Sequence, residues 1–159
     1  MATIEQEVRI ELGRSDDLDA VMAVMASAFG RRFGEAWTRS QLAGILPMSG
    51  VSLMLAREPG RKDAVGFSLF RTVADESELL LIAVLPSHHR RGVGRQLLDD
   101  FLQRARKAAV VRVHLEVRDG NPAVGMYLDA GFCPVGRRRS YYHAPDGERF
   151  DAITLAYDL

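Results

Sequence analysis

The sequence predicts a mixed α/β protein with one central sheet of about seven strands. Residues 79–85 form a continuously apolar run that ends at Pro86, which is typical of a strand covered on both faces and is too short to span a membrane. Residues 93–102 repeat apolar side chains at helical spacing. Residues 111–117 alternate apolar and polar side chains, as a strand with one buried face does. A strand, a helix and a second strand therefore follow one another at the centre of the chain.

The N-terminal elements follow from the same patterns. We expect residues 1–7 to be a flexible end. Residues 8–12 alternate and predict the first strand. Ser15 and Asp16 offer N-caps for a helix that ends near Gly30.

A short helix and two strands are predicted next. Thr38 and Gln41 fit a capping box at the start of the helix. Residues 51–56 and 65–73 predict two strands, and Pro59-Gly60 marks the turn between them.

The C-terminal part adds one helix and two strands. Asn121-Pro122 begins the helix and Gly131 ends it. Residues 132–135 and 153–157 predict the last two strands. Because the chain contains no linker and no repeat, we expect residues 1–159 to form a single domain.

Basic residues and glycines precede the central helix. Arg90, Arg91 and Arg95 surround Gly92 and Gly94. A helix N-terminus carries unpaired backbone N–H groups, glycines let an anion approach them, and guanidinium groups pair with phosphate oxygens. The pattern indicates a phosphate site, with solvated surface arginines as the alternative.

The loop does not match two other phosphate-binding motifs. A Walker A loop ends in Gly-Lys-Ser or Gly-Lys-Thr, which the sequence lacks. A dinucleotide fingerprint could use Gly92, Gly94 and the later Glu116, but Leu97 stands in place of its third glycine.

The loop resembles motif A of the GCN5-related N-acetyltransferases (GNAT), whose pattern is Gln or Arg, two residues, Gly, one residue, then Gly or Ala. Here His89 takes the first place and is followed by Gly92 and Gly94. The resemblance implies the GNAT fold, a mixed, mostly antiparallel sheet with a splay after the fourth strand and helices on both faces. It also implies acetyl-CoA as the acetyl donor, with its pyrophosphate on the loop amides.

The second half of the chain is similar to the RimI-type N-terminal acetyltransferases of this family. The residues that carry the similarity are Glu116-Val117-Arg118, Asn121, Tyr127, Gly131-Phe132 and Arg138-Arg139-Ser140-Tyr141-Tyr142. Enzymes of this group acetylate the N-terminal alanine of a small-subunit ribosomal protein. The resemblance therefore implies that the partner is such a protein N-terminus.

The resemblance also implies which residues bind the donor. The expected cofactor-binding residues are Ile82, Ala83, Val84, Arg90, Arg91, Gly92, Val93, Gly94, Arg95 and Asn121. Backbone N–H groups of the central strand would stabilise the negative charge that develops on the acetyl oxygen.

Two side chains are the catalytic candidates. An α-amine has a pKa of roughly 8, so a base must remove its proton, and the resemblance gives this role to Glu116. Tyr127 resembles the family's proton donor to the departing thiolate. The alternative for Glu116 is a solvated carboxylate on the polar face of a strand, and the alternative for Tyr127 is an amphipathic core tyrosine.

Tyr141 and Tyr142 are the expected substrate-binding residues, because by resemblance their loop closes over the acceptor. Two alternatives stay open, a small-amine (polyamine or antibiotic) acetyltransferase and a non-catalytic acyl-CoA sensor. The basic run 137–139 could bind nucleic acid, but a solvated sheet edge explains it more simply.

Composition sets the remaining expectations. The 21 basic and 21 acidic residues cancel, which disfavours a nucleic-acid partner. The single cysteine, Cys133, excludes an intrachain disulfide and is expected to be a small buried residue. We predict a cytoplasmic monomer or weak homodimer that has no metal site and no membrane association.

Overall fold

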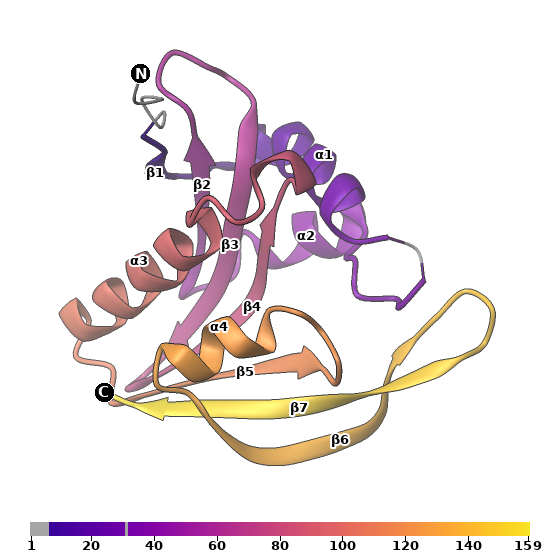
Figure 1. Ribbon diagram of the computed structural model, residues 1–159. Coiled ribbons are helices and arrows are strands. Elements are labelled where there is room, and N and C mark those ends of the chain that lie inside the picture. Colours follow the sequence, from indigo (N-terminus) through magenta and orange to yellow (C-terminus); the bar gives the residue numbers. More distant parts are fainter. Residues whose placement is uncertain (1–6, 31) are drawn as a thin grey trace, which may run out of the picture.

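The computed structural model describes residues 7–30 and 32–159, and these residues form a seven-stranded sheet (Figure 1). The strands are β1 (Arg9–Leu12), β2 (Val51–Arg57), β3 (Ala64–Val73), β4 (Glu76–Val84), β5 (Arg112–Arg118), β6 (Cys133–His143) and β7 (Arg149–Asp158). Their order is β1-β2-β3-β4-β5-β7-β6. The β4–β5 pair is parallel and the other described pairs are antiparallel. The predicted mixed, mostly antiparallel sheet is confirmed.

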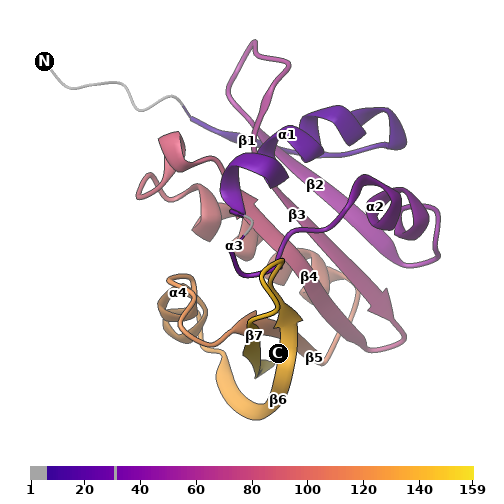
Figure 2. The same cartoon turned by 90° about the vertical axis from the view of Figure 1, so that its right-hand side faces the viewer.

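Helices cover both faces of the sheet, as predicted. The α-helices are α1 (Leu18–Ala28), α2 (Arg39–Ile45), α3 (Val93–Lys107) and α4 (Val124–Asp129), with short 3-10 helices at Ser15–Asp17 and Pro86–His88. In Figure 2, α1 and α2 lie on one side of the sheet, and α3 and α4 lie on the other.

The apolar core is divided by the sheet, and β3 contributes to both halves. Phe67 packs in the cluster that α1 and α2 cover, together with Met25 and Leu42. On the opposite face, Phe70 packs against Phe101 of α3, with ring centroids 4.9 Å apart. These two layers fix the strands on which the site is built.

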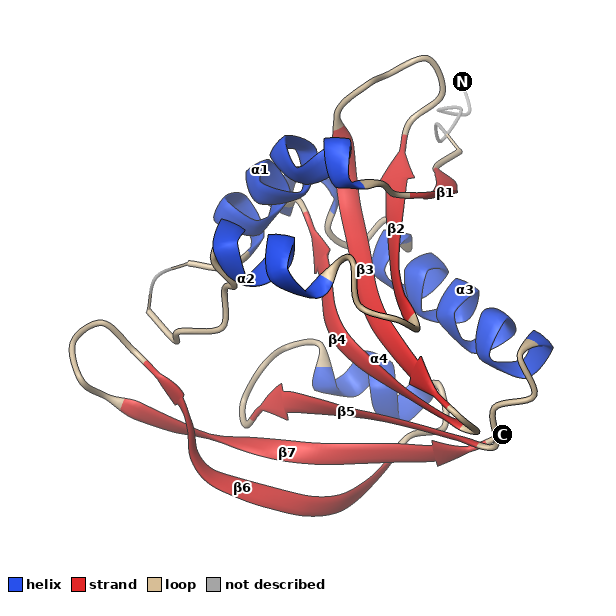
Figure 3. Ribbon diagram, turned by 180° about the vertical axis from the view of Figure 1, so that it is seen from behind, coloured by secondary structure: helices blue, strands red, loops and turns tan. Residues whose placement is uncertain are grey.

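The strands β4 and β5 separate after a short parallel pairing. The pairing runs from Glu76↔Arg112 to Leu79↔Leu115, and the part of the chain that the structure describes shows no further pairing between them. Beyond that point β4 stays with β3 and β5 stays with β7, so a gap opens between the two halves of the sheet (Figure 3). The expected splay after the fourth strand is confirmed.

Most predicted elements are present, with shifted boundaries. The Thr38 capping box is confirmed, because Thr38 Oγ1 accepts from the Gln41 N–H (3.1 Å) and Gln41 Oε1 accepts from the Thr38 N–H (2.8 Å). The predicted cap at Ser15 and Asp16 is wrong, since these residues form a 3-10 turn and α1 begins at Leu18. The expected flexible end at residues 1–7 lies, apart from Glu7, outside the described residues.

The last two strands are much longer than predicted. The sequence predicts strands at 132–135 and 153–157, whereas β6 and β7 form a long hairpin. Register shifts between Pro134 and Gly136 and between Arg138 and Tyr142 interrupt the alternation of side chains in β6. Strand β6 is also the sheet edge, and its residues are nearly all exposed, including Cys133, which was predicted to be buried.

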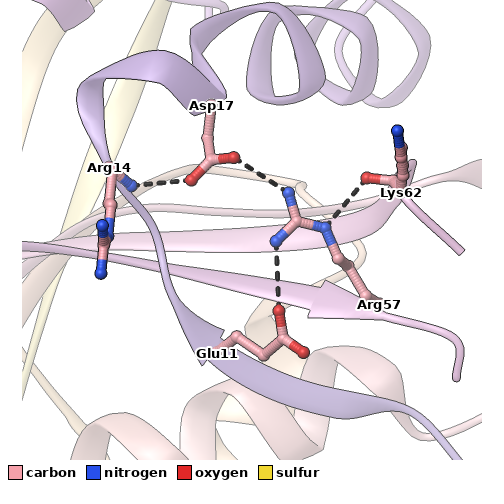
Figure 4. A network of polar contacts seen from close by, with 5 residues as sticks. All are labelled: Glu11, Arg14, Asp17, Arg57 and Lys62. Atoms are coloured by element: carbon pink, nitrogen blue, oxygen red, sulfur yellow. Dashed lines mark hydrogen bonds and ion pairs between the residues drawn. The ribbon is translucent and has the colours of Figure 1, made fainter. Parts of the chain in front are cut away.

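A polar network joins β1, the first 3-10 turn and the β2–β3 loop (Figure 4). The guanidinium of Arg57 donates to Glu11 Oε2 (3.2 Å), to Asp17 Oδ1 (3.0 Å) and to the carbonyl oxygen of Lys62 (2.9 Å). Asp17 Oδ2 also accepts from the Arg14 N–H (2.8 Å). The network lies at the β1–β2 edge, away from the gap between β4 and β5.

None of the described helices is long and apolar enough to cross a membrane.

Candidate active site

A pocket opens where β4 and β5 separate. Its walls come from six parts of the chain: the α1–α2 segment, β4, β5, the β5–α4 loop, α4 and β6. The lining residues are Phe29, Glu35, Trp37, Glu78, Leu79, Leu80, Leu81, Ile82, Leu115, Glu116, Val117, Asn121, Tyr127, Tyr141 and Tyr142. The structure therefore brings both predicted catalytic residues and both predicted substrate-binding tyrosines into one pocket.

The backbone of β4 turns two N–H groups toward the gap. The Leu85 N–H donates to the Val65 carbonyl oxygen of β3 (2.8 Å), so by strand alternation the N–H groups of Ile82 and Val84 point away from β3. The N–H of the intervening Ala83 points toward β3. His89 Nε2 donates to the Val84 carbonyl oxygen (2.9 Å), which ties the glycine loop to the end of β4.

The glycine loop leads into the N-terminus of α3. Gly92 caps the helix with φ +77°, in the left-handed region, and a Cβ at this position would meet nothing within 4 Å. The first intrahelical bond runs from Gln96 N–H to the Gly92 carbonyl oxygen (2.9 Å), so the N–H groups of Val93, Gly94 and Arg95 belong to the first, unpaired turn. Arg90 and Arg91 are exposed beside it.

The side chains of the loop and of the first turn of α3 differ in burial and in their contacts. Val93 is buried in the core, so only its backbone faces outward. Arg95 Nε donates to Asp99 Oδ1 one turn later (2.9 Å). The exposed N–H groups, the open space above Gly92 and the free faces of Arg90 and Arg91 suit a bound diphosphate.

Glu116 is held by two side chains whose contacts with it the sequence did not predict. Its side chain is 10% exposed; Oε1 pairs with Arg138 Nε of β6 (2.9 Å) and Oε2 accepts from Thr154 Oγ1 of β7 (2.8 Å). The alternative of a solvated carboxylate on a polar strand face is therefore wrong. Arg138 is 63% exposed, so this partner can move away from Glu116.

Tyr127 reaches the pocket from α4. Its ring packs edge-on against Phe132, with centroids 5.9 Å apart. Burial, followed by the nearby Tyr142 and Glu35, raises the pKa of Tyr127 far above its ordinary value of 10.0. The hydroxyl therefore keeps its proton well into the alkaline range, and its role as proton donor stays a prediction.

The two substrate-binding candidates lie on β6 beside its second register shift. Their rings meet edge-to-face with centroids 4.9 Å apart, and the Tyr142 hydroxyl donates to the Glu116 carbonyl oxygen (3.4 Å). The pKa of Tyr142 is raised, first by burial and then by the nearby Glu35, Tyr141 and Glu116. Arg118 acts in the opposite direction. Tyr141 is the more exposed of the pair.

Sequence reasoning missed Glu35. This residue lies in the segment between α1 and α2, and its carboxylate accepts from Arg118 Nε (3.0 Å) and from Asn121 Nδ2 (2.8 Å). An isolated acid in a loop gives no periodic signal, and its partners are 83 and 86 positions away in the chain. Asn121 also accepts from the Ala123 N–H through Oδ1 (2.8 Å), so its predicted contact with the donor stays a prediction.

Within residues 7–30 and 32–159, no group of three or more His, Cys, Asp or Glu side chains is arranged to hold a metal ion.

Residues 18–132 match the pattern of the family described as "Acetyltransferase (GNAT) family". The chain belongs to the GNAT acetyltransferase family. This family uses acetyl-CoA as acetyl donor, and the first turn of α3, with its unpaired N–H groups and the open space at Gly92, fits its diphosphate. The predicted family and fold are confirmed.

Two curated relatives are similar to the chain over part of its length. The ribosomal protein bS18-alanine N-acetyltransferase of Haemophilus influenzae is 37% identical over 92 residues, and that of Escherichia coli K12 is 41% identical over 94 residues. Each match covers 58% of this chain and 63% of the relative, so the chain matches less than two thirds of their length.

A solved structure extends the similarity to nearly the whole chain. The crystal structure of the ribosomal-protein-S18-alanine N-acetyltransferase from Escherichia coli superposes with a TM-score of 0.85 at 29% identity. The superposition covers 96% of this chain and 94% of that chain. These findings confirm the resemblance to the RimI-type group.

Proposed function

We propose that this GNAT acetyltransferase transfers the acetyl group of acetyl-CoA to the N-terminal α-amine of a protein, with the alanine N-terminus of a small-subunit ribosomal protein as acceptor. The observation that carries the proposal is the convergence of Glu116, Tyr127 and Ile82 on one pocket, with the N–H group of Ile82 turned away from β3. The similarity of the chain to the bS18-alanine N-acetyltransferases supports this choice of acceptor.

The donor would lie along the gap and the start of α3. The N–H groups of Val93, Gly94 and Arg95 and the guanidiniums of Arg90 and Arg91 would bind its diphosphate. Gly92 leaves the space above this turn open. Ile82 and Val84 would contact the acyl end through their backbone, and Asn121 would contact the donor from the other side of the gap.

The chemistry needs two protons removed from the acceptor ammonium, one proton supplied to the departing sulfur and one contact that stabilises negative charge. When bound, acetyl-CoA would supply a thioester whose acetyl group an amine can attack directly. Glu116 would take the first proton of the ammonium once Arg138 has moved away from the carboxylate. The N–H groups of Ile82 and Val84 would stabilise the negative charge on the acyl oxygen while the C–N bond forms. As the C–S bond breaks, Tyr127 would donate a proton to the sulfur, and the second proton, which the nitrogen loses as the amide forms, would restore the Tyr127 hydroxyl.

The pocket also favours a peptide as acceptor. Trp37, Tyr141 and Tyr142 are aromatic wall residues of the pocket that Glu116 also lines. These large aromatic side chains would pack against the first residues of an extended peptide, a contact that a slender polyamine offers less surface to make. The same proposal includes residues 1–159 as a single domain, a cytoplasmic location and a monomeric or weakly dimeric state.

The test is the release of CoA thiol with a panel of acceptors. The panel holds a peptide that begins with the alanine of ribosomal protein bS18, the same peptide with a blocked N-terminus, and several polyamines. Turnover on the free peptide alone supports the proposal. Turnover on polyamines alone would make the protein a small-amine acetyltransferase, and binding of acetyl-CoA without turnover on any acceptor would favour a sensor.

A further inference from the structure

Two buried charges join distant parts of the chain beside the pocket. Glu35 and Arg118 form an ion pair (3.0 Å) in which the side chains are 12% and 9% exposed. The guanidinium of Arg118 lies over the ring of Phe33, with its central carbon 3.6 Å from the centroid. Removing one partner of such a pair leaves the other charge buried and uncompensated, so the arrangement favours a single position of the loop.

Further contacts attach the same loop to the β6–β7 hairpin. The rings of Phe33 and Phe150 meet edge-to-face with centroids 5.0 Å apart. Gly34 has φ +68°, and a Cβ added there would lie 2.1 Å from the His143 carbonyl oxygen. Only glycine fits this close approach, so the α1–α2 segment is fastened to both β5 and the hairpin.

Glu35 is also connected to the start of α4. Asn121 donates to Glu35 through Nδ2 and accepts from the Ala123 N–H through Oδ1. Ala123 is the N-cap of α4, and its carbonyl oxygen accepts from the Tyr127 N–H (3.3 Å). One chain of contacts therefore runs from Glu35 to the backbone of the proposed proton donor.

Glu35 and Glu116, two of the three described carboxylates that line the pocket, differ in their partners. Arg138, the partner of Glu116, is largely exposed and can leave. Arg118 is buried, and Asn121 occupies the second oxygen of Glu35. Glu35 is therefore fixed in place, which suits a group that positions others and does not suit a proton acceptor.

We propose that Glu35 is the positioning residue of the acceptor pocket: its contacts with Arg118 and Asn121 hold the Trp37 wall and the first turn of α4 so that the Tyr127 hydroxyl faces the reacting atoms. The identity of the acceptor in this inference rests on the function proposed above. The placement of the wall and of the helix does not depend on it.

Three variants separate positioning from general stability. Glu35→Ala removes both contacts, and Glu35→Gln keeps an oxygen that accepts from Asn121 but loses the charge that pairs with Arg118. Asp17→Asn is the matched control, because Asp17 pairs with the largely buried Arg57 (3.0 Å) at the opposite edge of the sheet. All three variants are expected to lower the melting temperature.

Kinetics with the bS18 peptide give the first readout. For Glu35→Ala we expect kcat/KM for the peptide to fall by about 100-fold, the loss typical of a misplaced catalytic group, while KM for acetyl-CoA stays within about twofold. Glu35→Gln should recover part of this loss, and Asp17→Asn should match the wild type. An unchanged kcat/KM in Glu35→Ala would overturn the proposal.

Fluorescence gives a readout that needs no acceptor. Trp37 is the single tryptophan, lies two positions after Glu35 and lines the pocket. Glu35→Ala should shift its emission to longer wavelength and increase quenching by acrylamide below the melting temperature, whereas Asp17→Asn should leave both unchanged. Wild-type emission and quenching in Glu35→Ala would refute the inference, even if the wild-type enzyme ignored the peptide and the proposed function had failed.

Discussion

Gly92 offers a sharp test of the proposed diphosphate site. It caps α3 with φ +77°, and a Cβ at this position would meet open space. Gly60, in the β2–β3 loop, has φ +75° and equally open surroundings. Replacing either glycine by alanine therefore imposes the same kind of backbone strain without a steric clash, and only Gly92 lies at the start of α3.

The expected loss of stability follows from the shared conformation. An L-residue in the left-handed region costs roughly 1–2 kcal/mol, and the reduced freedom of the unfolded chain returns about 0.4–1 kcal/mol. We expect Gly92→Ala and Gly60→Ala each to lower the free energy of unfolding by about 1 kcal/mol. In a chain of this size the melting temperature should fall by about 2–4 °C in both variants.

Binding should separate the two variants. In Gly92→Ala the new methyl group would occupy part of the open space in which the diphosphate is proposed to lie, so we expect the dissociation constant for acetyl-CoA, measured by calorimetry, to rise at least about tenfold, or 1.4 kcal/mol. Gly60→Ala should bind as the wild type does. Equal affinity in the two variants would refute the placement of the diphosphate at the start of α3.

Further predictions concern catalysis, packing and pH. Glu116→Gln and Tyr127→Phe should each lower kcat by about 100- to 10,000-fold in steady-state assays with an unchanged KM for acetyl-CoA, and a loss below threefold would remove the residue from its role. Ser68→Ala should raise the free energy of unfolding in urea by about 1–3 kcal/mol, because the fully buried Ser68 hydroxyl has no partner in the described part of the chain; a decrease would contradict this. Burial raises the pKa of Tyr127, so the unfolded chain ionises there near pH 10 while the folded hydroxyl keeps its proton; the contribution of Tyr127 to stability should be constant below pH 10 and fall by about 1.4 kcal/mol per pH unit above it, and because the pKa of Tyr142 is also raised, Tyr127→Phe should reduce the measured alkaline slope without abolishing it.

The regular elements could be predicted where one periodic pattern dominates. The apolar run of β4 and the helical spacing of α3 each reflect burial against a neighbouring layer, and both predictions are confirmed. Strand β6 lacked such a pattern because it is an exposed edge with two register shifts, so its length was underestimated. The prediction of the splay between β4 and β5 came from the family resemblance and not from periodicity.

The site was only partly accessible to sequence reasoning. Glu116 and Tyr127 stood in a recognisable motif, and the structure brings them to the same pocket. The groups that hold the two carboxylates, Arg138 and Arg118, are recruited across the fold from separate segments. Contacts of this kind depend on tertiary packing, so the spacing of residues along the chain does not predict them.

The central claim is that the acetyl group reaches an N-terminal α-amine. The most direct measurement is fragmentation mass spectrometry of a bS18 peptide that contains an internal lysine, after incubation with acetyl-CoA and the enzyme. We predict one added acetyl group, located on fragments that contain the N-terminal alanine. An acetyl group found only on the lysine side chain, or no modification of a peptide with a free N-terminus, would contradict the claim.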